Sequence, residues 1–118
     1  MKTILVQHKF DFNIAQYAES FRPIARIMGV TPTFINRFDP NNPFCFNECN
    51  KETKLLIITD FINKNGIVDF VDKMSIANQI TVNKNHELAF SISPIIVICF
   101  DYEFDSIPGK ELFKINQL

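Results

Sequence analysis

Near the end of the chain, acidic and aromatic residues alternate in the order Phe100, Asp101, Tyr102, Glu103, Phe104 and Asp105. Successive side chains of an extended chain point to opposite faces, so three carboxylates would share one face and three rings the other. A row of this kind suits three roles: ligands for a divalent metal ion, a surface that binds a basic protein, or the solvated side of a strand. The rest of the sequence has to distinguish them.

A metal site at this row would need ligands from elsewhere. Same-face neighbours in a strand lie about 7 Å apart, which is too far for three consecutive carboxylates to hold one ion. Asp60, at the end of another predicted strand, is the one obvious additional acid. We therefore predict no metal ion and no catalytic residue in this row.

Two cysteines and two histidines raise a second metal hypothesis. Cys45 and Cys49 form a C-x-x-x-C pair, and His8 and His86 could complete a four-ligand zinc site. Structural zinc sites usually contain C-x-x-C with a matching second pair, which this sequence lacks. We predict that the two thiols pack in a loop beside neighbouring aromatic rings, and that the protein binds no metal and no other cofactor.

His8 also ends the first predicted strand, where α/β folds often place functional groups. A nucleophilic thiol would have to lie within hydrogen-bond reach of this imidazole, and Cys99 sits in an apolar run that predicts a buried side chain. The sequence contains no Gly-rich phosphate loop, Ser nucleophile elbow or H-E-x-x-H motif. We therefore predict that the protein is not an enzyme; the alternative is a small enzyme that uses His8 with a cysteine or with Asp60.

The acidic row is accompanied by further acidic residues. No Lys or Arg occurs between Lys84 and Lys110, and two more acids lie in or beside a long loop predicted at residues 39–52. Charge steers association and aromatic rings anchor it, so an acidic surface bordered by exposed rings is typical of a site for a basic protein surface. The predicted partner-binding residues are Asp39, Phe44, Phe46, Glu48, Asp101, Tyr102, Glu103 and Asp105.

Composition sets the outer limits of these hypotheses. With 118 residues, 47% of them hydrophobic, the chain is the size of one domain that buries its own core, spanning residues 1–118. The net charge of −1 does not favour direct binding of nucleic acid, which needs a clustered basic surface. No apolar stretch reaches the roughly 18 residues that span a bilayer, and an odd number of cysteines argues against a secreted disulfide framework. We expect a cytoplasmic protein with no membrane contact.

The first third of the chain predicts a strand, a helix and a second strand. Residues 2–10 are apolar enough for a central strand. A helix follows and stops at Gly29, with Pro23 expected to kink or divide it. Residues 30–38 alternate like a strand, and Pro32 places that strand at a sheet edge or near its own end.

The loop at residues 39–52 has no periodicity and is rich in Asn and Pro, which is typical of an exposed, mobile loop. The elements predicted after it are a buried strand at 53–61, a helix capped by Asn65, two short strands around a turn at Lys84 and Asn85, a long strand at 94–104, and a short strand or helical turn at 110–118. The order β-α-β-loop-β-α-β-β-β predicts an α+β fold, a single small domain with a mostly antiparallel sheet and two helices on one face.

The segment PGKELFKI, at residues 108–115, resembles the C-terminal GKEIFKI-type ending of small phage-derived type II-C anti-CRISPR proteins that bind the HNH domain of an RNA-guided nuclease. The chain length and the order of a first strand then helix, and a middle strand then helix, are similar as well. This resemblance implies a non-enzymatic inhibitor that holds a nuclease in an inactive arrangement.

Three functions remain open from the sequence, apart from the small enzyme. The first is a protein from a phage or mobile element that inhibits a nuclease through the acidic, aromatic edge, since nuclease surfaces are basic. The second is an immunity protein that neutralises a bacterial toxin and shares the same features. The third is a self-assembling structural module, such as a homodimer, in which exposed strand edges pair between copies.

Overall fold

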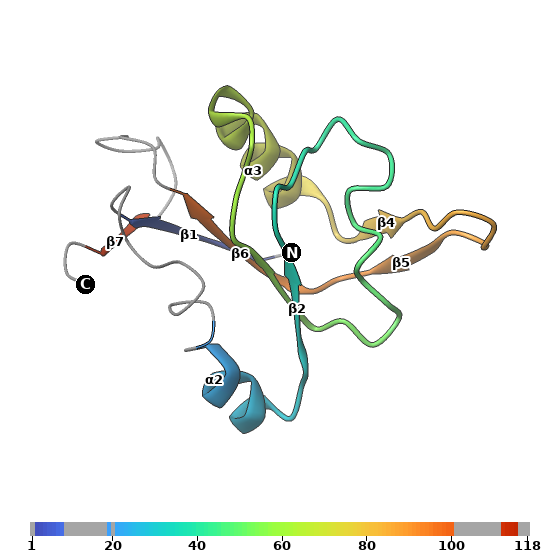
Figure 1. Cartoon of the computed structure of the whole chain (residues 1–118), viewed down its shortest axis with the longest axis horizontal. Coiled ribbons are helices and arrows are strands. Elements are labelled where there is room, and N and C mark those ends of the chain that lie inside the picture. Colours follow the sequence, from blue (N-terminus) through green and yellow to red (C-terminus); the bar gives the residue numbers. More distant parts are fainter. Residues whose placement is uncertain (1, 9–18, 20, 101–111, 116–118) are drawn as a thin grey trace.

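A five-stranded sheet forms the centre of the computed structural model, which describes residues 2–8, 19, 21–100 and 112–115 (Figure 1). All five strands run parallel. In their order across the sheet they are β2 (Pro32–Ile35), β3 (Leu55–Ile58), β6 (Ile95–Phe100), β1 (Thr3–His8) and β7 (Leu112–Ile115). The predicted edge position of the strand containing Pro32 is confirmed, and the tail forms a strand rather than a helical turn.

The prediction of a mostly antiparallel sheet is wrong. All four residues of β3 and the last five of β6 are buried. Strands covered on both faces carry continuous apolar runs instead of alternating ones, and such strands are typical of parallel sheets. The runs LLII and IIVICF were therefore the signal for parallel pairing. The coarser prediction, a small α+β fold, is confirmed.

Both faces of this sheet are covered, each by one of the two described α-helices. Leu56 and Ile58 join the buried cluster under α3 (Ile67–Ile76), whereas Leu55 and Ile57 join a second cluster that includes Ala25 of α2 (Phe21–Met28). Figure 1 shows the two helices on opposite sides of the sheet. The prediction of both helices on one face is therefore wrong.

The handedness of the crossovers explains this arrangement. From β1 to β2 the chain moves across the sheet past β6 and β3, and α2 lies on one face. From β2 to β3 and from β3 to β6 it moves in the opposite direction, and the loop after β2 and helix α3 pack on the other face. Because parallel crossovers share one hand, connections that run in opposite directions must lie on opposite faces.

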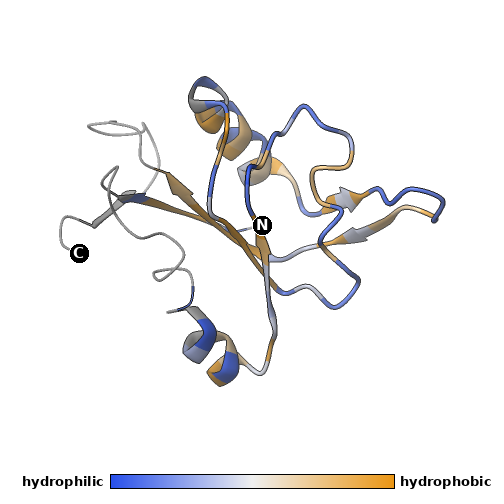
Figure 2. Ribbon diagram, in the orientation of Figure 1, coloured by the Kyte–Doolittle hydropathy of each residue, from blue (hydrophilic) through white to orange (hydrophobic). Residues whose placement is uncertain are grey.

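A small hairpin lies between α3 and β6. Its strands, β4 (Ile80–Val82) and β5 (Phe90–Ile92), pair antiparallel, as predicted from the sequence. Ile80, Val82 and Ile92 extend the core on the α3 side. Figure 2 shows apolar residues at the base of the hairpin and hydrophilic ones toward its tip.

The start of α3 differs from the prediction that Asn65 caps it. Gly66 is the N-cap and makes no side-chain capping bond, and a 3-10 turn at Lys64–Gly66 leads into the helix. The side-chain oxygen of Asn63 accepts a hydrogen bond of 3.2 Å from the backbone amide of Asn65. The asparagine that shapes this turn therefore lies two residues earlier than predicted.

Helix α2 ends in a Schellman motif, as the position of Gly29 predicts. The backbone amide of Gly29 donates to the carbonyl of Arg26, and that of Val30 donates to the carbonyl of Ala25, at 3.0 and 2.9 Å. Gly29 has a φ of 71°, in the left-handed region that glycine adopts without steric cost. Pro23 is the third residue of α2, and Glu19, four residues before it, is helical as well; the prediction that Pro23 kinks or divides the helix concerns a stretch that includes residues outside the described ranges.

We expect the Gly29→Ala variant to lose about 1 kcal/mol of unfolding free energy, because alanine is strained at positive φ. Beyond the adjacent residues of the chain, no atom lies within 4 Å of the added Cβ, so the loss would be a backbone effect alone. The measurement is urea denaturation followed by circular dichroism. Gly29→Asn is the control and should lose less, since asparagine tolerates this conformation; equal losses in the two variants would contradict the backbone explanation.

Candidate functional site

The loop between β2 and β3, residues 39–53, is built from consecutive turns. The side-chain oxygens of Asp39, Asn42 and Asn50 each accept a hydrogen bond from the backbone amide two residues later, at 3.0, 3.0 and 2.9 Å. Short polar side chains that bond to nearby backbone in this way favour turns over helices and strands. The abundance of Asn therefore explains why this crossover contains no helix.

One side of the loop belongs to the core. The Cys49 side chain is fully buried in the cluster under α3, and the Phe46 ring centre lies 5.3 Å from that of Phe38. Near the end of the loop, the buried Thr53 hydroxyl lies 3.1 Å from that of Thr33 and also accepts a hydrogen bond from a loop backbone amide. The loop lacks regular structure, as predicted, but it is only partly exposed.

The other side of the loop borders a shallow groove of about 390 Å³. Three of the predicted partner-binding residues, Asp39, Phe44 and Glu48, line this groove together. The Phe44 side chain is 42% exposed. The fourth predicted residue in this segment, Phe46, faces the core and a second pocket instead.

Arg37 also lines the groove, although no sequence pattern pointed to it. Its φ is 56°, an uncommon conformation for a residue other than glycine. It lies just after β2, before Phe38 resumes parallel pairing with Phe61. The groove therefore contains two carboxylates, one guanidinium and one exposed ring, which leaves an excess of one negative charge.

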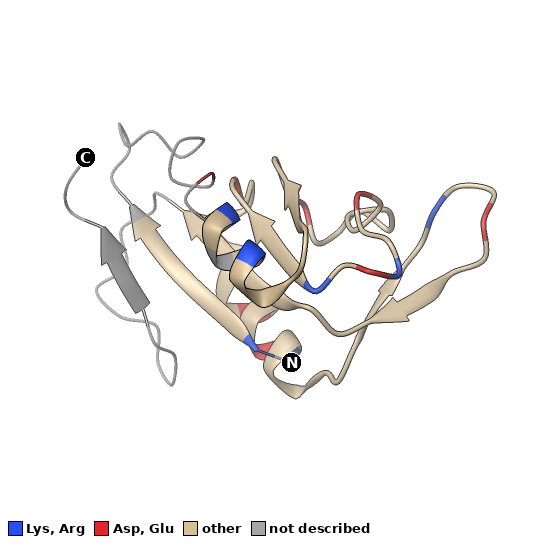
Figure 3. Ribbon diagram, turned by 90° about the horizontal axis from the view of Figure 1, so that it is seen from below, with Lys and Arg blue, Asp and Glu red and all other residues tan. Residues whose placement is uncertain are grey.

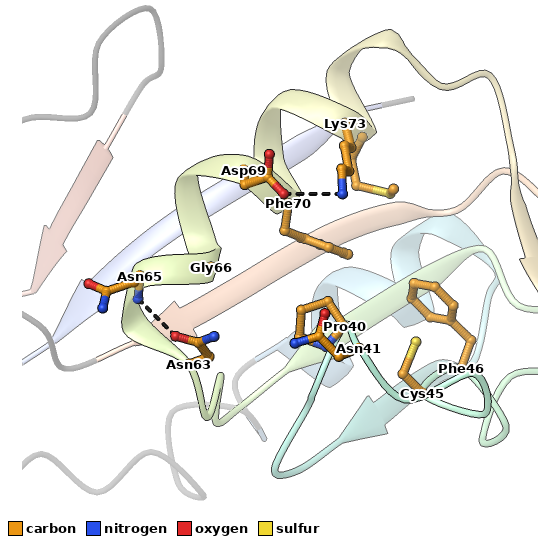
Figure 4. A pocket seen from close by; sticks show the side chains of 11 residues that line it. Pro40, Asn41, Cys45, Phe46, Asn63, Asn65, Gly66, Asp69, Phe70 and Lys73 are labelled. Atoms are coloured by element: carbon orange, nitrogen blue, oxygen red, sulfur yellow. Dashed lines mark hydrogen bonds and ion pairs between the residues drawn. The ribbon is translucent and has the colours of Figure 1, made fainter.

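A second pocket, of about 370 Å³, lies between the loop and the start of α3 (Figure 4). The lining residues are Pro40, Asn41, Cys45, Phe46, Asn63, Asn65, Gly66, Asp69, Phe70, Lys73 and Met74. Sequence reasoning missed this site, because its residues come from segments with no shared motif. The loop contributes to both sites, and Cys45 lines the pocket as well as the groove.

The four remaining partner-binding residues, Asp101, Tyr102, Glu103 and Asp105, lie outside the described residues. They follow Phe100, the last residue of β6, in the sequence. The carboxyl ends of parallel strands share one edge of a sheet, and ligands of such sheets bind outside that edge. Asp60, two residues after β3, and His8, the last residue of β1, belong to the same edge.

The three cysteines have raised pKa values, chiefly because burial disfavours the thiolate. The pKa is about 11 for Cys45 and for Cys49, and about 12 for Cys99. A catalytic thiol needs the opposite shift. Cys99 packs on the α2 side of the sheet and the other two on the α3 side. The described geometry thus offers no activated thiol for the alternative of a cysteine enzyme.

The other predicted chemistry-bearing residues are dispersed. His86 is exposed in the β4–β5 connection, with a φ of 65°, whereas His8 ends a strand of the main sheet. In the part of the chain that the structure describes, no three His, Cys, Asp or Glu residues are close enough to hold a metal ion. Figure 3 shows basic and acidic residues interspersed along the loops and helices.

None of the helices in the described ranges is both long and apolar enough to cross a membrane. No protein-family model, curated protein or solved structure matches the chain.

Proposed function

We propose that this chain is a non-enzymatic inhibitor that binds a nuclease with a basic surface, and that the groove beside residues 39–48 is part of its contact surface. The observation that carries this proposal is the meeting of Asp39, Phe44 and Glu48 in one groove. They are three of the four residues in this segment that charge and aromatic character predict as partner-binding, independently of how the loop folds.

The groove combines the two features that protein recognition requires. Carboxylates at the rim of an interface steer a basic partner and increase the rate of association. A partly exposed ring such as that of Phe44 supplies apolar area and accepts a cation over its face. Nuclease surfaces are basic because they bind phosphates, so their exposed Arg and Lys side chains match this groove.

Two features of the sequence support the same function. The acidic row at residues 101–105 directly follows β6 in the sequence. The resemblance of residues 108–115 to type II-C anti-CRISPR proteins indicates an HNH nuclease domain as the partner. A toxin nuclease offers the same basic surface, so partner identity distinguishes anti-CRISPR activity from toxin immunity.

Neutralising the two groove carboxylates should weaken inhibition about tenfold, as expected for the loss of charge pairs at an interface rim. In the variant Asp39→Asn/Glu48→Gln, the amide introduced at position 39 keeps the oxygen that accepts the Asn41 backbone N–H, so the turn is preserved. The measurement is cleavage of target DNA by purified type II-C RNA-guided nuclease, and of a nucleic-acid substrate by purified toxin nucleases, with increasing amounts of each variant.

The matched control is Glu52→Gln/Glu87→Gln, which removes the same charge from exposed residues that do not line the groove. It should inhibit as the native sequence does. Equal inhibition by both double variants would remove the groove from the contact surface. Failure of the native chain to inhibit any nuclease in the panel at stoichiometric amounts would overturn the proposed function.

A further inference from the structure

The pocket between the loop and α3 has an apolar wall that contains two aromatic rings. The rings of Phe46 and Phe70 have centres 6.5 Å apart, and the thiol of Cys45 and the side chain of Met74 line the same space. Its volume of about 370 Å³ falls in the range of small-molecule sites, which pair an apolar lining with a few polar groups.

The polar groups of this pocket are mostly amides. Asn41 comes from the loop, and Asn63 comes from the turn before α3, as Figure 4 shows. A carboxamide presents a donor and an acceptor side by side, which matches the adjacent N6 amino group and N7 of adenine. The side-chain oxygen of Asn63 accepts one hydrogen bond from the Asn65 backbone amide. This bond uses neither the side-chain amino group of Asn63 nor the second lone pair of the oxygen. Asn41 is held through its backbone amide, a contact that does not use its side chain.

The charges of the pocket compensate one another. The ammonium group of Lys73 lies 3.1 Å from the Asp69 carboxylate, and both side chains are 71% exposed at the rim. A phosphate would have to compete with this carboxylate for the lysine, whereas ribose hydroxyls can donate to it. The pocket therefore favours an uncharged ligand over a nucleotide.

We propose that this pocket binds an uncharged purine nucleoside, with adenosine as the preferred ligand. The purine ring lies against Phe46, one of the two amides, Asn41 or Asn63, pairs with N6 and N7, and the ribose lies toward Asp69. This proposal does not depend on the inhibitor function, because none of Phe46, Asn41, Asn63 and Asp69 lines the groove; the two sites share Cys45. A bound nucleoside would nevertheless favour the loop conformation that forms the groove.

The test is titration of the full chain with adenosine. Binding is monitored by calorimetry and by NMR of the backbone amides and the methionine methyl groups. We expect saturable binding at ~1 mM ligand or below, with shifts at the Met74 methyl group and at the amides of residues 41 and 63. Inosine carries an acceptor where adenosine has the N6 donor. It should bind about tenfold more weakly, because the bidentate pair is lost.

Two nearly isosteric variants test the amides, namely Asn41→Asp and Asn63→Asp. Each replaces an amino donor by an oxygen, and the carboxylate introduced at position 63 still accepts the Asn65 amide, which preserves the turn. At least one variant should lose about tenfold in adenosine affinity, whereas the control Asn47→Asp, on the groove side of the loop, should lose none. No saturable binding, shifts confined to other surfaces, or native affinity in both variants would each overturn the proposal.

Discussion

The Phe38→Ala variant is expected to lose about 3–5 kcal/mol of unfolding free energy, the usual cost of deleting a buried phenylalanine ring. Phe38 is 1% exposed, and its ring centre lies 5.1–5.5 Å from those of Phe46, Phe61 and Phe70. It therefore joins the loop, the segment after β3 and helix α3 at one point. The measurement is urea denaturation monitored by circular dichroism at neutral pH.

The control for this prediction is Phe44→Ala. Both residues belong to the same stretch of chain, but Phe44 is 42% exposed and should lose less than about 1 kcal/mol. If the proposed function holds, Phe44→Ala should instead reduce binding to the proposed nuclease partner. Similar stability losses in the two variants would contradict the assignment of one ring to the core and the other to the surface.

The stability of the folded protein is expected to fall steeply above pH 9, in part because of Cys99. Burial raises the pKa of this thiol from 9.0 to about 12 in the folded state. The folded protein then retains a proton that the unfolded chain releases, so unfolding becomes easier as the pH rises from 9 toward 12. Between pH 8 and pH 10.5 this group alone should account for a loss of about 2 kcal/mol, and all of its contribution is present below pH 9.

The measurement is unfolding free energy as a function of pH in the native sequence and in Cys99→Val, which keeps an apolar side chain of similar size. Other groups titrate in this range in both proteins, so the difference between the two curves isolates Cys99. The variant should lose less stability than the native protein on going from pH 8 to pH 10.5. Parallel curves would show that the thiol is not desolvated.

The sequence predicted the order of elements well because that order depends on local patterns. The strand around Leu55, the helix around Phe70 and the paired short strands before β6 all occur where periodicity and turn residues indicated. Gly29 ends a helix because positive φ is a local property. Whether the strands of the main sheet run parallel or antiparallel depends instead on which distant segments pair. The hairpin pattern favoured a prediction of antiparallel pairing, but among the described strands only β4 and β5 pair in this way.

The groove was predictable from the sequence only in part. Asp39, Phe44 and Glu48 belong to one loop, so predicting an exposed loop at these residues also predicted that the three lie near one another. The Phe44 side chain is exposed and the Phe46 side chain packs against the core because of a succession of turns. Turns have no regular period, so hydrophobic periodicity could not predict this difference. The pocket is further removed from sequence reasoning, since Asn41 and Asn63 meet only through the packing of the loop against α3.

The position of β1 between β6 and β7 constrains when this protein can fold during synthesis. β1 is the first described strand to leave the ribosome, yet its partners are β6 and β7, and Thr3 pairs with Ile96. Both edges of β1 therefore remain unpaired until most of the chain has been translated. Such long-range parallel pairing is slow and leaves apolar segments available for aggregation meanwhile. Chains that terminate before β6 would lack both strands that flank β1 and should accumulate as insoluble or degraded fragments.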